Sequence, residues 1–240
     1  MQSTSALYKT IVADPNHWIE NRLVITGVGT FAETQLFSVE TTGNTVENKP
    51  QVGHAVSGEV NIKMVNPSAT IPRMAELKPQ YRAVRINNGT QETSEWLAKG
   101  VYYIDTRSIS QGASEEVLTM HGYDAMLKGE QDYPSSGHDW PYIDKSVVAE
   151  IASAIGVSVD ARTNEYLTAG YMIGLPLGYT IREVLSQIAG AYGGNFIISN
   201  EGKLLFVPLY GFDPSIIGNY LADENGNALV FGNEGWYILV

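Results

Sequence analysis

The spacing of apolar residues changes from about 2 to about 3.6 after residues 132–137 of the 240-residue chain, and this change most constrains the fold. In residues 58–65 every second residue is apolar (Val60, Ile62 and Met64), the pattern of a strand with one buried face. In residues 144–155 apolar residues recur about every 3.6 residues, which is typical of a helix with one buried face. The chain is therefore predicted to combine β-structure with a later region that contains helices.

The first region contains six predicted strands, separated by sequences such as Asn87-Asn88-Gly89 that favour turns. The composition agrees with β-structure, because the chain has 24 Gly and 14 Tyr and its charged fraction is 17%. Strands at such regular spacing favour an antiparallel sandwich or a small barrel. The predicted strands cover residues 22–28, 34–42, 58–65, 81–86, 100–108 and 116–121.

A turn-forming sequence at 132–137 separates the two regions. Beyond it, the apolar stripe of 144–155 predicts a helix with Asp144 as N-cap and Gly156 as C-cap. Residues 157–179 show neither a helical nor a strand period, so an irregular segment is expected there.

A second helix is predicted to begin at Thr180, because Thr180 and Glu183 have the spacing of a capping box. Its apolar face ends before Gly193-Gly194. A hairpin should follow, with strands at 196–199 and 204–207.

Residues 211–240 again favour β-structure, with a hairpin turn expected at Asn225-Gly226. The sequence stops within an apolar run, 236–240, so we expect that strand to pair with a neighbour or to continue into further protein. The predicted fold class is α+β, mainly β. A tube-like antiparallel β-barrel domain should span 7–132, a smaller α+β domain with two helices and a hairpin 140–210, and a β segment that begins or returns to a second barrel 211–240.

The charge and composition of the chain exclude several classes of protein and of site. The formal net charge of −11 argues against specific nucleic-acid binding, which needs a surplus of Lys and Arg on one face. The chain has no cysteine, so disulfides, thiol nucleophiles and Cys-ligated zinc are excluded. No segment has the ~18 consecutive apolar residues of a membrane span, and no signal peptide is evident.

Four stretches resemble the tail hub proteins of bacteriophages and prophages, a family related to phage baseplate hubs. One contains Gly100-Val101-Tyr102-Tyr103-Ile104-Asp105, and another is Tyr123-Asp124-Ala125-Met126-Leu127. Their order and spacing carry the likeness more than any single motif does. The four stretches are 94–105, 123–127, 147–157 and 179–208.

The resemblance implies a structural subunit, not an enzyme, in the tip or baseplate hub of a phage or prophage tail. It implies a homotrimeric ring that joins the tail tube to tip proteins, with the family's second tube-like barrel lying mostly beyond residue 240. The expected partners are further copies of the chain and neighbouring tail-tube and tail-tip proteins, with no membrane insertion. The expected location is the virion tail, assembled in the cytoplasm of the bacterial host.

Two sequence matches to ligand-binding loops are better explained by turns. Residues 27–32 fit the glycine pattern of a dinucleotide-binding loop, but a predicted strand follows where that loop needs a helix. Residues 223–234 resemble a calcium loop, but Ala228 stands where that loop needs glycine. We therefore expect no cofactor and no metal.

The histidines and carboxylates also form no predicted site. His121 and Asp124 would supply only two metal ligands, and a glycosidase needs two carboxyl groups held across a cleft. No catalytic residue is assigned. The remaining candidates considered are His17, His54, His138, Glu130, Asp132, Asp139 and Asp144.

Two aromatic loops leave an alternative open. Ser94-Glu95-Trp96 and Asp139-Trp140-Pro141-Tyr142 are equally consistent with protein contacts and with anchoring of a loop by a half-buried Trp. They also suggest a module that binds cell-surface carbohydrate. The third hypothesis is a tail-associated hydrolase of the cell wall.

Overall fold

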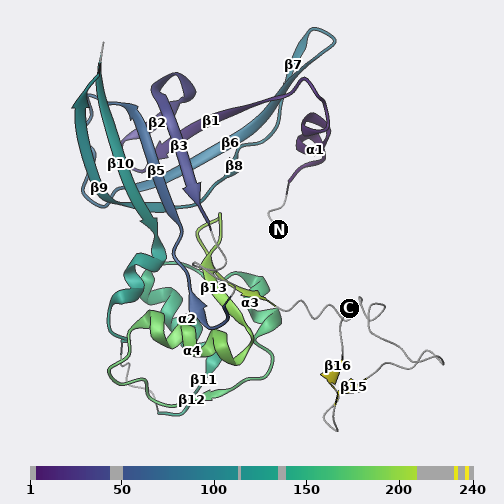
Figure 1. Ribbon diagram of the computed structural model, residues 1–240, viewed down its shortest axis with the longest axis vertical. Helices are drawn as coiled ribbons and strands as arrows, with labels where there is room; N and C mark the ends of the chain where they lie inside the picture. Colours follow the sequence, from purple (N-terminus) through teal and green to yellow (C-terminus); the bar gives the residue numbers. More distant parts are fainter. Residues whose placement is uncertain are drawn as a thin grey trace, which may run out of the picture. The chain divides into compact units, whose positions relative to one another are not determined.

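The computed structural model describes residues 4–43, 51–112, 115–134, 139–209, 230–231 and 236–237 (Figure 1). The chain divides into two compact units, Met1–Pro208 and Leu209–Val240. In the second unit, β15 (Val230–Phe231) pairs antiparallel with β16 (Trp236–Tyr237). The turn predicted at residues 225–226 lies outside the described residues.

An antiparallel sheet dominates the first unit and contains all six predicted strands. Two short strands, β7 (Thr90–Thr93) and β8 (Leu97–Ala98), also pair with its longest strand. Along the sheet the order is β2 (Gly29–Ala32), β1 (Trp18–Ile25), β6 (Glu76–Asn87), β9 (Tyr102–Gln111), β10 (Glu116–Asp124), β5 (Glu59–Val65) and β3 (Leu36–Thr42).

This sheet is not closed, so the predicted barrel is wrong in that respect. Strands β2 and β3 are its two edges, and no ladder joins them within the described part of the chain. β2 has only four residues, and the 3-10 turn η1 (Glu33–Gln35) follows it directly. Because the chain leaves β2 so soon, that strand offers little backbone for pairing with β3.

The inner face of the sheet forms its own core. Val60, Ile62 and Met64 of β5 are fully buried, as their alternation predicts. They belong to one cluster with Leu23 and Met120, which are also fully buried. Burial of one such side chain contributes about 2 kcal/mol to stability, so this face holds the sheet together.

A short helix near the N-terminus, α1 (Ala6–Val12), was not predicted. The Ser5 side chain caps it by accepting a hydrogen bond from the Tyr8 N–H at 3.0 Å. The ring of Tyr8 meets that of Tyr81 edge-on, and Ile11 is fully buried. A helix of seven residues with one buried side chain is too short to produce a recognisable period.

The region after the sheet confirms both predicted helices, as α2 (Asp144–Ile155) and α4 (Ile181–Ala191). The N-cap of α2 is Ile143, one residue before the expected Asp144, and Gly156 ends the helix with a φ of 80°. A third helix, α3 (Ala161–Tyr166), lies in the segment expected to be irregular, so the prediction of two helices is wrong. Asp160 caps α3 through the Arg162 N–H, a local signal that the search for periodicity missed.

The predicted hairpin is present as β13 (Gly194–Ile198) and β14 (Leu204–Pro208). Its outer edge is extended by β4 (His54–Ala55), which runs parallel to β13. Strands β11 (Tyr142–Ile143) and β12 (Met172–Ile173) form a separate pair, and η2 (Ala125–Glu130) is a 3-10 helix that follows β10. Helices α2 and α4 pack with the hairpin around a second core that includes Ile151, Leu185 and Phe206.

Candidate functional site

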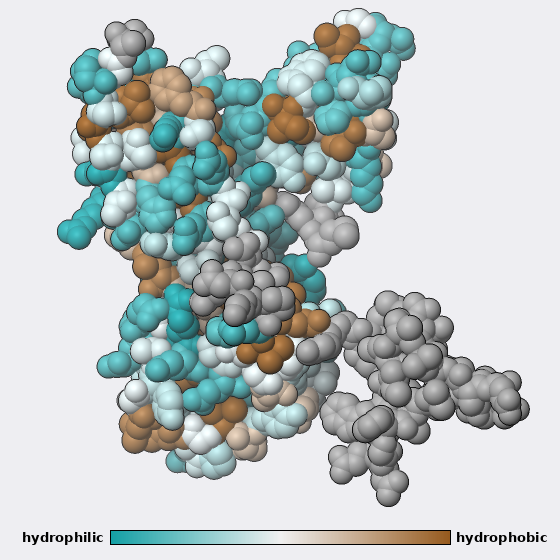
Figure 2. Space-filling view, viewed as in Figure 1, coloured by the Kyte–Doolittle hydropathy of each residue, from teal (hydrophilic) through white to brown (hydrophobic). Residues whose placement is uncertain are grey.

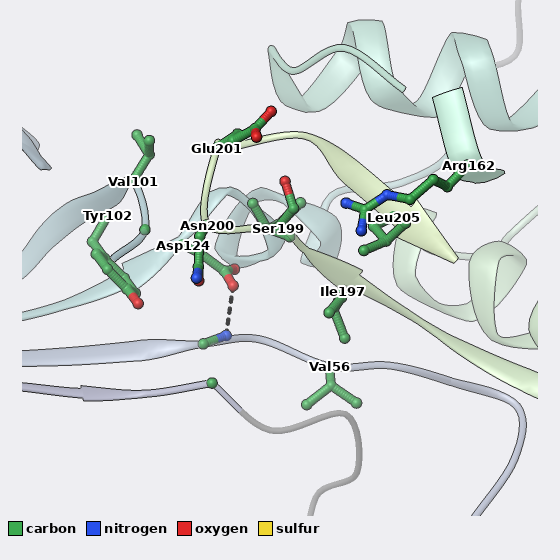
Figure 3. A pocket seen from close by; sticks show the side chains of 14 residues that line it. Val56, Val101, Tyr102, Asp124, Arg162, Ile197, Ser199, Asn200, Glu201 and Leu205 are labelled. Carbon is green, nitrogen blue, oxygen red and sulfur yellow. Dashed lines mark hydrogen bonds between the residues drawn. The ribbon is translucent and has the colours of Figure 1, made fainter. Parts of the chain in front are cut away.

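The strongest candidate site lies where β10 ends and the helical region begins. Asp124 is almost completely buried there, and its carboxylate accepts three hydrogen bonds. The donors are Gly58 N–H at 2.6 Å, Met126 N–H at 2.9 Å and the Ser57 hydroxyl at 3.1 Å. Asp124 therefore caps η2 and fixes the start of β5 at the same time (Figure 3).

Arg182 of α4 crosses the same boundary. Its guanidinium donates to the carbonyl of Ala55 at 2.8 Å and to that of Met126 at 3.1 Å. Its Nε lies 2.6 Å from a carboxylate oxygen of Glu130. One side chain thus ties α4 to β4 and η2, which are distant in the sequence.

Burial changes the titration of the groups at this boundary. It raises the pKa of Asp124 to about 6, although the hydrogen bonds from Gly58, Met126 and Ser57 and the charge of Arg182 act in the opposite direction. Burial and the nearby Asp124 charge also raise the pKa of Tyr102 to about 12. For Asp124 the main cause is desolvation, because burial removes water from the charged carboxylate.

A cavity of about 200 Å³ lies beside Asp124. Figure 3 shows Val101 and Tyr102 on one side of it and Ile197, Leu205 and Arg162 on the other. The walls therefore come from the sheet and from the β13–β14 hairpin with α3.

The charged groups of this cavity already have partners in the protein. Arg162 donates to both carboxylate oxygens of Asp160 at 2.8 Å, and Glu201 lies 2.9 Å from Lys203 Nζ. The Asp124 carboxylate accepts hydrogen bonds from backbone N–H groups. The cavity thus offers no pair of free carboxyl groups among its described residues, which is what glycoside hydrolysis needs.

The other carboxylates considered from the sequence are dispersed and have structural roles. Asp144 is fully buried at the start of α2, where it accepts hydrogen bonds from Tyr171 N–H and the Tyr192 hydroxyl. Glu130 pairs with Arg182, and the backbone of Asp132 bridges to Thr180. Asp139 is exposed.

The histidines are also dispersed. His17 Nδ1 lies 2.6 Å from the carbonyl oxygen of Asp14, and the backbone N–H of His54 donates to Asn195. His121 lies near Glu59 and Asp105, whereas the Asp124 carboxylate considered with it from the sequence accepts from Gly58, Met126 and Ser57. Across the described residues, no group of three or more His, Asp or Glu side chains is placed to hold a metal ion. His138 lies outside those residues.

The two ligand-loop matches have different outcomes. Gly27 has a φ of 77° in the turn between β1 and β2, and the edge strand at residues 29–32 is followed by the single 3-10 turn η1 and strand β3, not by an α-helix. The interpretation as a glycine-containing turn is confirmed. The calcium-like stretch 223–234 falls largely outside the described residues.

Both aromatic loops anchor the chain. The Trp140 ring packs edge-on against Tyr133 and Tyr142, next to the core of the helical region. The Trp96 ring lies beneath two guanidinium groups, with Arg22 Cζ 4.2 Å and Arg82 Cζ 4.5 Å from its centroid. Sequence reasoning missed these arginines, because a local pattern does not show which strands become neighbours.

Comparison with known proteins gives a likeness in structure and none in sequence. No protein-family model matches the chain, and no curated protein matches it. The structure is similar to the 43 kDa tail protein of prophage MuSo2 from Shewanella oneidensis, with a TM-score of 0.55 over 85% of this chain and 61% of that one. The chain has the fold of a prophage tail protein.

At 15% identity this likeness concerns the fold alone, and the chain spans about three fifths of the MuSo2 protein. The tail protein of Neisseria meningitidis MC58 is also similar, with 10% identity, a TM-score of 0.47 and coverage of 90% of this chain and 56% of that one. The predicted resemblance to phage tail proteins is confirmed at the level of fold, and the finer assignment to the hub stays a prediction. Among the described residues, no helix is long and apolar enough to cross a membrane.

Proposed function

We propose that the chain is a structural, non-enzymatic subunit of a phage or prophage tail. In this proposal it belongs to the tip or baseplate hub and forms a homotrimeric ring that joins the tail tube to tip proteins. The supporting observation is the shared fold with the MuSo2 tail protein over 85% of this chain. The hub position and the ring rest on the sequence resemblance.

The edges of the open sheet are the first surfaces through which such a subunit would contact its neighbours. β3 is an edge strand and carries Phe37, whose side chain is 54% exposed. An edge strand presents unpaired N–H and C=O groups, which pair readily with a strand of another chain. The open sheet therefore suits assembly better than a closed barrel would.

A second contact surface is the apolar segment 171–179. No charged residue occurs from Tyr166 to Ile181, yet Met172 and Leu177 are 61% and 69% exposed. In the view of Figure 2, apolar side chains gather at the end of the unit where Figure 1 places β11 and β12. Exposed apolar surface of this kind is typical of protein interfaces, and we assign it to a neighbouring tail protein.

The structure does not favour the two alternative functions. The carboxylates considered for a hydrolase are held by backbone groups and arginines, as Asp124 and Glu130 show. The aromatic loops considered for carbohydrate binding pack against the protein's own rings and guanidinium groups.

Deletion of the gene from the prophage or phage that carries it tests this function. Particles made without the chain should have incomplete tails and lose infectivity, and the intact gene supplied in trans should restore both. Leu177→Asp would restore less, whereas Thr168→Asp, at an exposed position just before this segment, would serve as the matched control. Complete, infective particles made without the chain would refute the proposal.

A further inference from the structure

The outer face of strands β1 and β6 carries a cluster of arginine and tryptophan. Arg22 is paired in register with Gln80, and Glu20 with Arg82, so these four side chains project from the same face of the sheet. The ring of Trp96, which precedes β8, lies against both guanidinium groups. We call Trp18, Arg22, Arg82, Ile86 and Trp96 the arginine face.

Helix α1 packs on the opposite side of these strands. The Tyr8 ring contacts Tyr81, which alternates along β6 with Arg82 and therefore points the other way. Trp18 and Ile86 are 39% and 63% exposed. The arginine face is thus an outer surface that combines large apolar side chains with positive charge.

The described carboxylates of the chain neutralise only part of the positive charge of the arginine face. Arg82 lies 2.7 Å from a carboxylate oxygen of Glu20. The Arg22 Nε instead donates to the neutral amide of Gln80 at 2.6 Å, and Arg22 has no ion pair with any described residue. Burial, followed by the charge of Arg82, lowers the pKa of Arg22. Trp and Arg are the residues most enriched at the energetic centres of protein interfaces.

The complementary charge lies on the outer face of strands β3, β5, β10 and β9. Glu59 and Asp105 flank His121 at 3.7 Å and 4.0 Å, and both carboxylates are nearly half exposed. Glu40 of β3 is paired in register with Asn61, which is itself paired with His121, so Glu40 projects from the same face. We call Glu40, Glu59 and Asp105 the carboxylate patch.

We infer that the arginine face of one copy of this chain docks on the carboxylate patch of a second copy. A second copy of the chain has the complementary charge, because the chain carries −11 overall and the arginine face is locally positive. The two surfaces differ and lie on different strands of one sheet, so the contact is head-to-tail. A head-to-tail contact closes into a ring when its rotation permits, and otherwise continues as a filament.

This inference deepens the proposed function, because it names the surfaces through which the copies of the ring would meet. The test uses the full chain and its molar mass in solution by light scattering, over a wide range of protein and salt concentration. The wild type should associate, and salt should weaken the association because it screens exposed charges. Arg22→Glu and Glu59→Lys/Asp105→Lys should each raise the dissociation constant at least about tenfold.

Mixing the two variants is the decisive step. The Glu at position 22 of one variant faces the lysines of the other, and the unchanged surfaces of the two remain complementary. Each variant alone should associate at least about tenfold more weakly than the wild type, and the mixture should associate again through contacts between unlike variants. A ring of three cannot alternate two variants, so one of its three contacts would stay mismatched and the mixture should not fully reach wild-type association. Arg73→Glu is the matched control, because Arg73 is an exposed arginine outside the arginine face. Thermal unfolding of each variant checks that it is folded.

A wild type that stays monomeric at every concentration would overturn the inference, as would variants that associate like the wild type. A mixture that does not recover association would also overturn it. These outcomes are separate from those of the gene deletion. If deletion abolishes tails but charge reversal leaves association unchanged, the proposed function stands and the docking surfaces are wrong.

Discussion

The carboxylate of Asp124 accepts a hydrogen bond of 2.6 Å from the backbone N–H of Gly58, although 66 residues separate the two in the sequence. This contact joins the end of β10 to the start of β5 at the point where the sheet meets the helical region. A Cβ atom added at Gly58 would lie 3.0 Å from Asp124 Oδ2 and 3.3 Å from the carbonyl oxygen of Thr42, so glycine leaves room for this close approach. The boundary between the sheet and the helical region is therefore held by hydrogen bonds within the first unit.

The titration of Asp124 predicts a specific dependence of stability on pH. Its pKa is raised from 3.8 to about 6 on folding, so the folded state binds the proton more tightly than the unfolded state. This group therefore stabilises the folded state fully below about pH 4, and the contribution is lost as pH rises through about 6, with an upper limit of about 3 kcal/mol. Asp124→Asn removes this contribution.

The measurement is the free energy of unfolding of the wild type and of Asp124→Asn by urea at several values of pH from 4 to 7. The difference between the two proteins should shrink as pH rises. Hydrogen bonds with Arg162 lower the pKa of Asp160 to about 2. Asp160 therefore titrates below this range of pH, and its contribution to stability is the same in both proteins. A difference that does not change with pH, or that grows as pH rises, contradicts the assignment.

Removal of the Arg182 side chain should destabilise the first unit strongly. Arg182→Ala leaves the carbonyl groups of Ala55 and Met126 without their donor and Glu130 without its cation. We expect a loss of about 3 kcal/mol in the free energy of unfolding. Arg73→Ala, at an exposed arginine, should change it by less than about 0.5 kcal/mol. Equal effects of the two variants would show that Arg182 does not hold the boundary between the sheet and the helical region.

The capping box of α4 gives a prediction with an internal control. The Thr180 hydroxyl accepts from the Glu183 N–H at 3.2 Å, and the Glu183 carboxylate accepts from the Thr180 N–H at 2.7 Å. Thr180→Ala should cost about 1 kcal/mol of stability in urea unfolding. Thr180→Ser keeps the hydroxyl and should be nearly neutral. If serine is as damaging as alanine, the methyl group of Thr180 and not its hydroxyl supports the helix.

Gly122 of β10 lies at the register shift between β10 and β9, where the backbones of the two strands approach closely. A Cβ atom at this position would lie 2.5 Å from the carbonyl oxygen of Tyr103, which belongs to the backbone of β9 and cannot easily move. We expect Gly122→Ala to lower the free energy of unfolding by about 2 kcal/mol or more. Gly174→Ala is the control, since nothing lies within 4 Å of a Cβ there. Similar melting temperatures for both variants would contradict the close approach.

Local signals in the sequence predicted the local elements well. The stripe of 144–155 and the left-handed Gly156 defined α2, and Thr180 with Glu183 defined the start of α4. The alternation in β5 identified its buried face. In each case neighbours in the sequence carry the physical cause, namely burial of one face or a hydrogen bond within one turn.

Long-range relationships were not predictable in the same way. The sequence does not show that Asp124 meets Gly58, or that Arg22 and Arg82 share the ring of Trp96. These contacts depend on which strands pair, and a strand pattern specifies a face but not a partner. The same reason explains the incorrect expectation of a closed barrel, since closure depends on the pairing of β2 with β3.

The most direct test of the central claim is to locate the chain in assembled particles. Particles would be purified from cells in which the gene carries an epitope tag, and gold-labelled antibody against the tag would be imaged by electron microscopy. The account predicts label at the tip of the tail and at no other position on the particle. Tails that are complete but carry no label, while the tagged protein remains in the fraction without particles, would contradict a structural role in the tail.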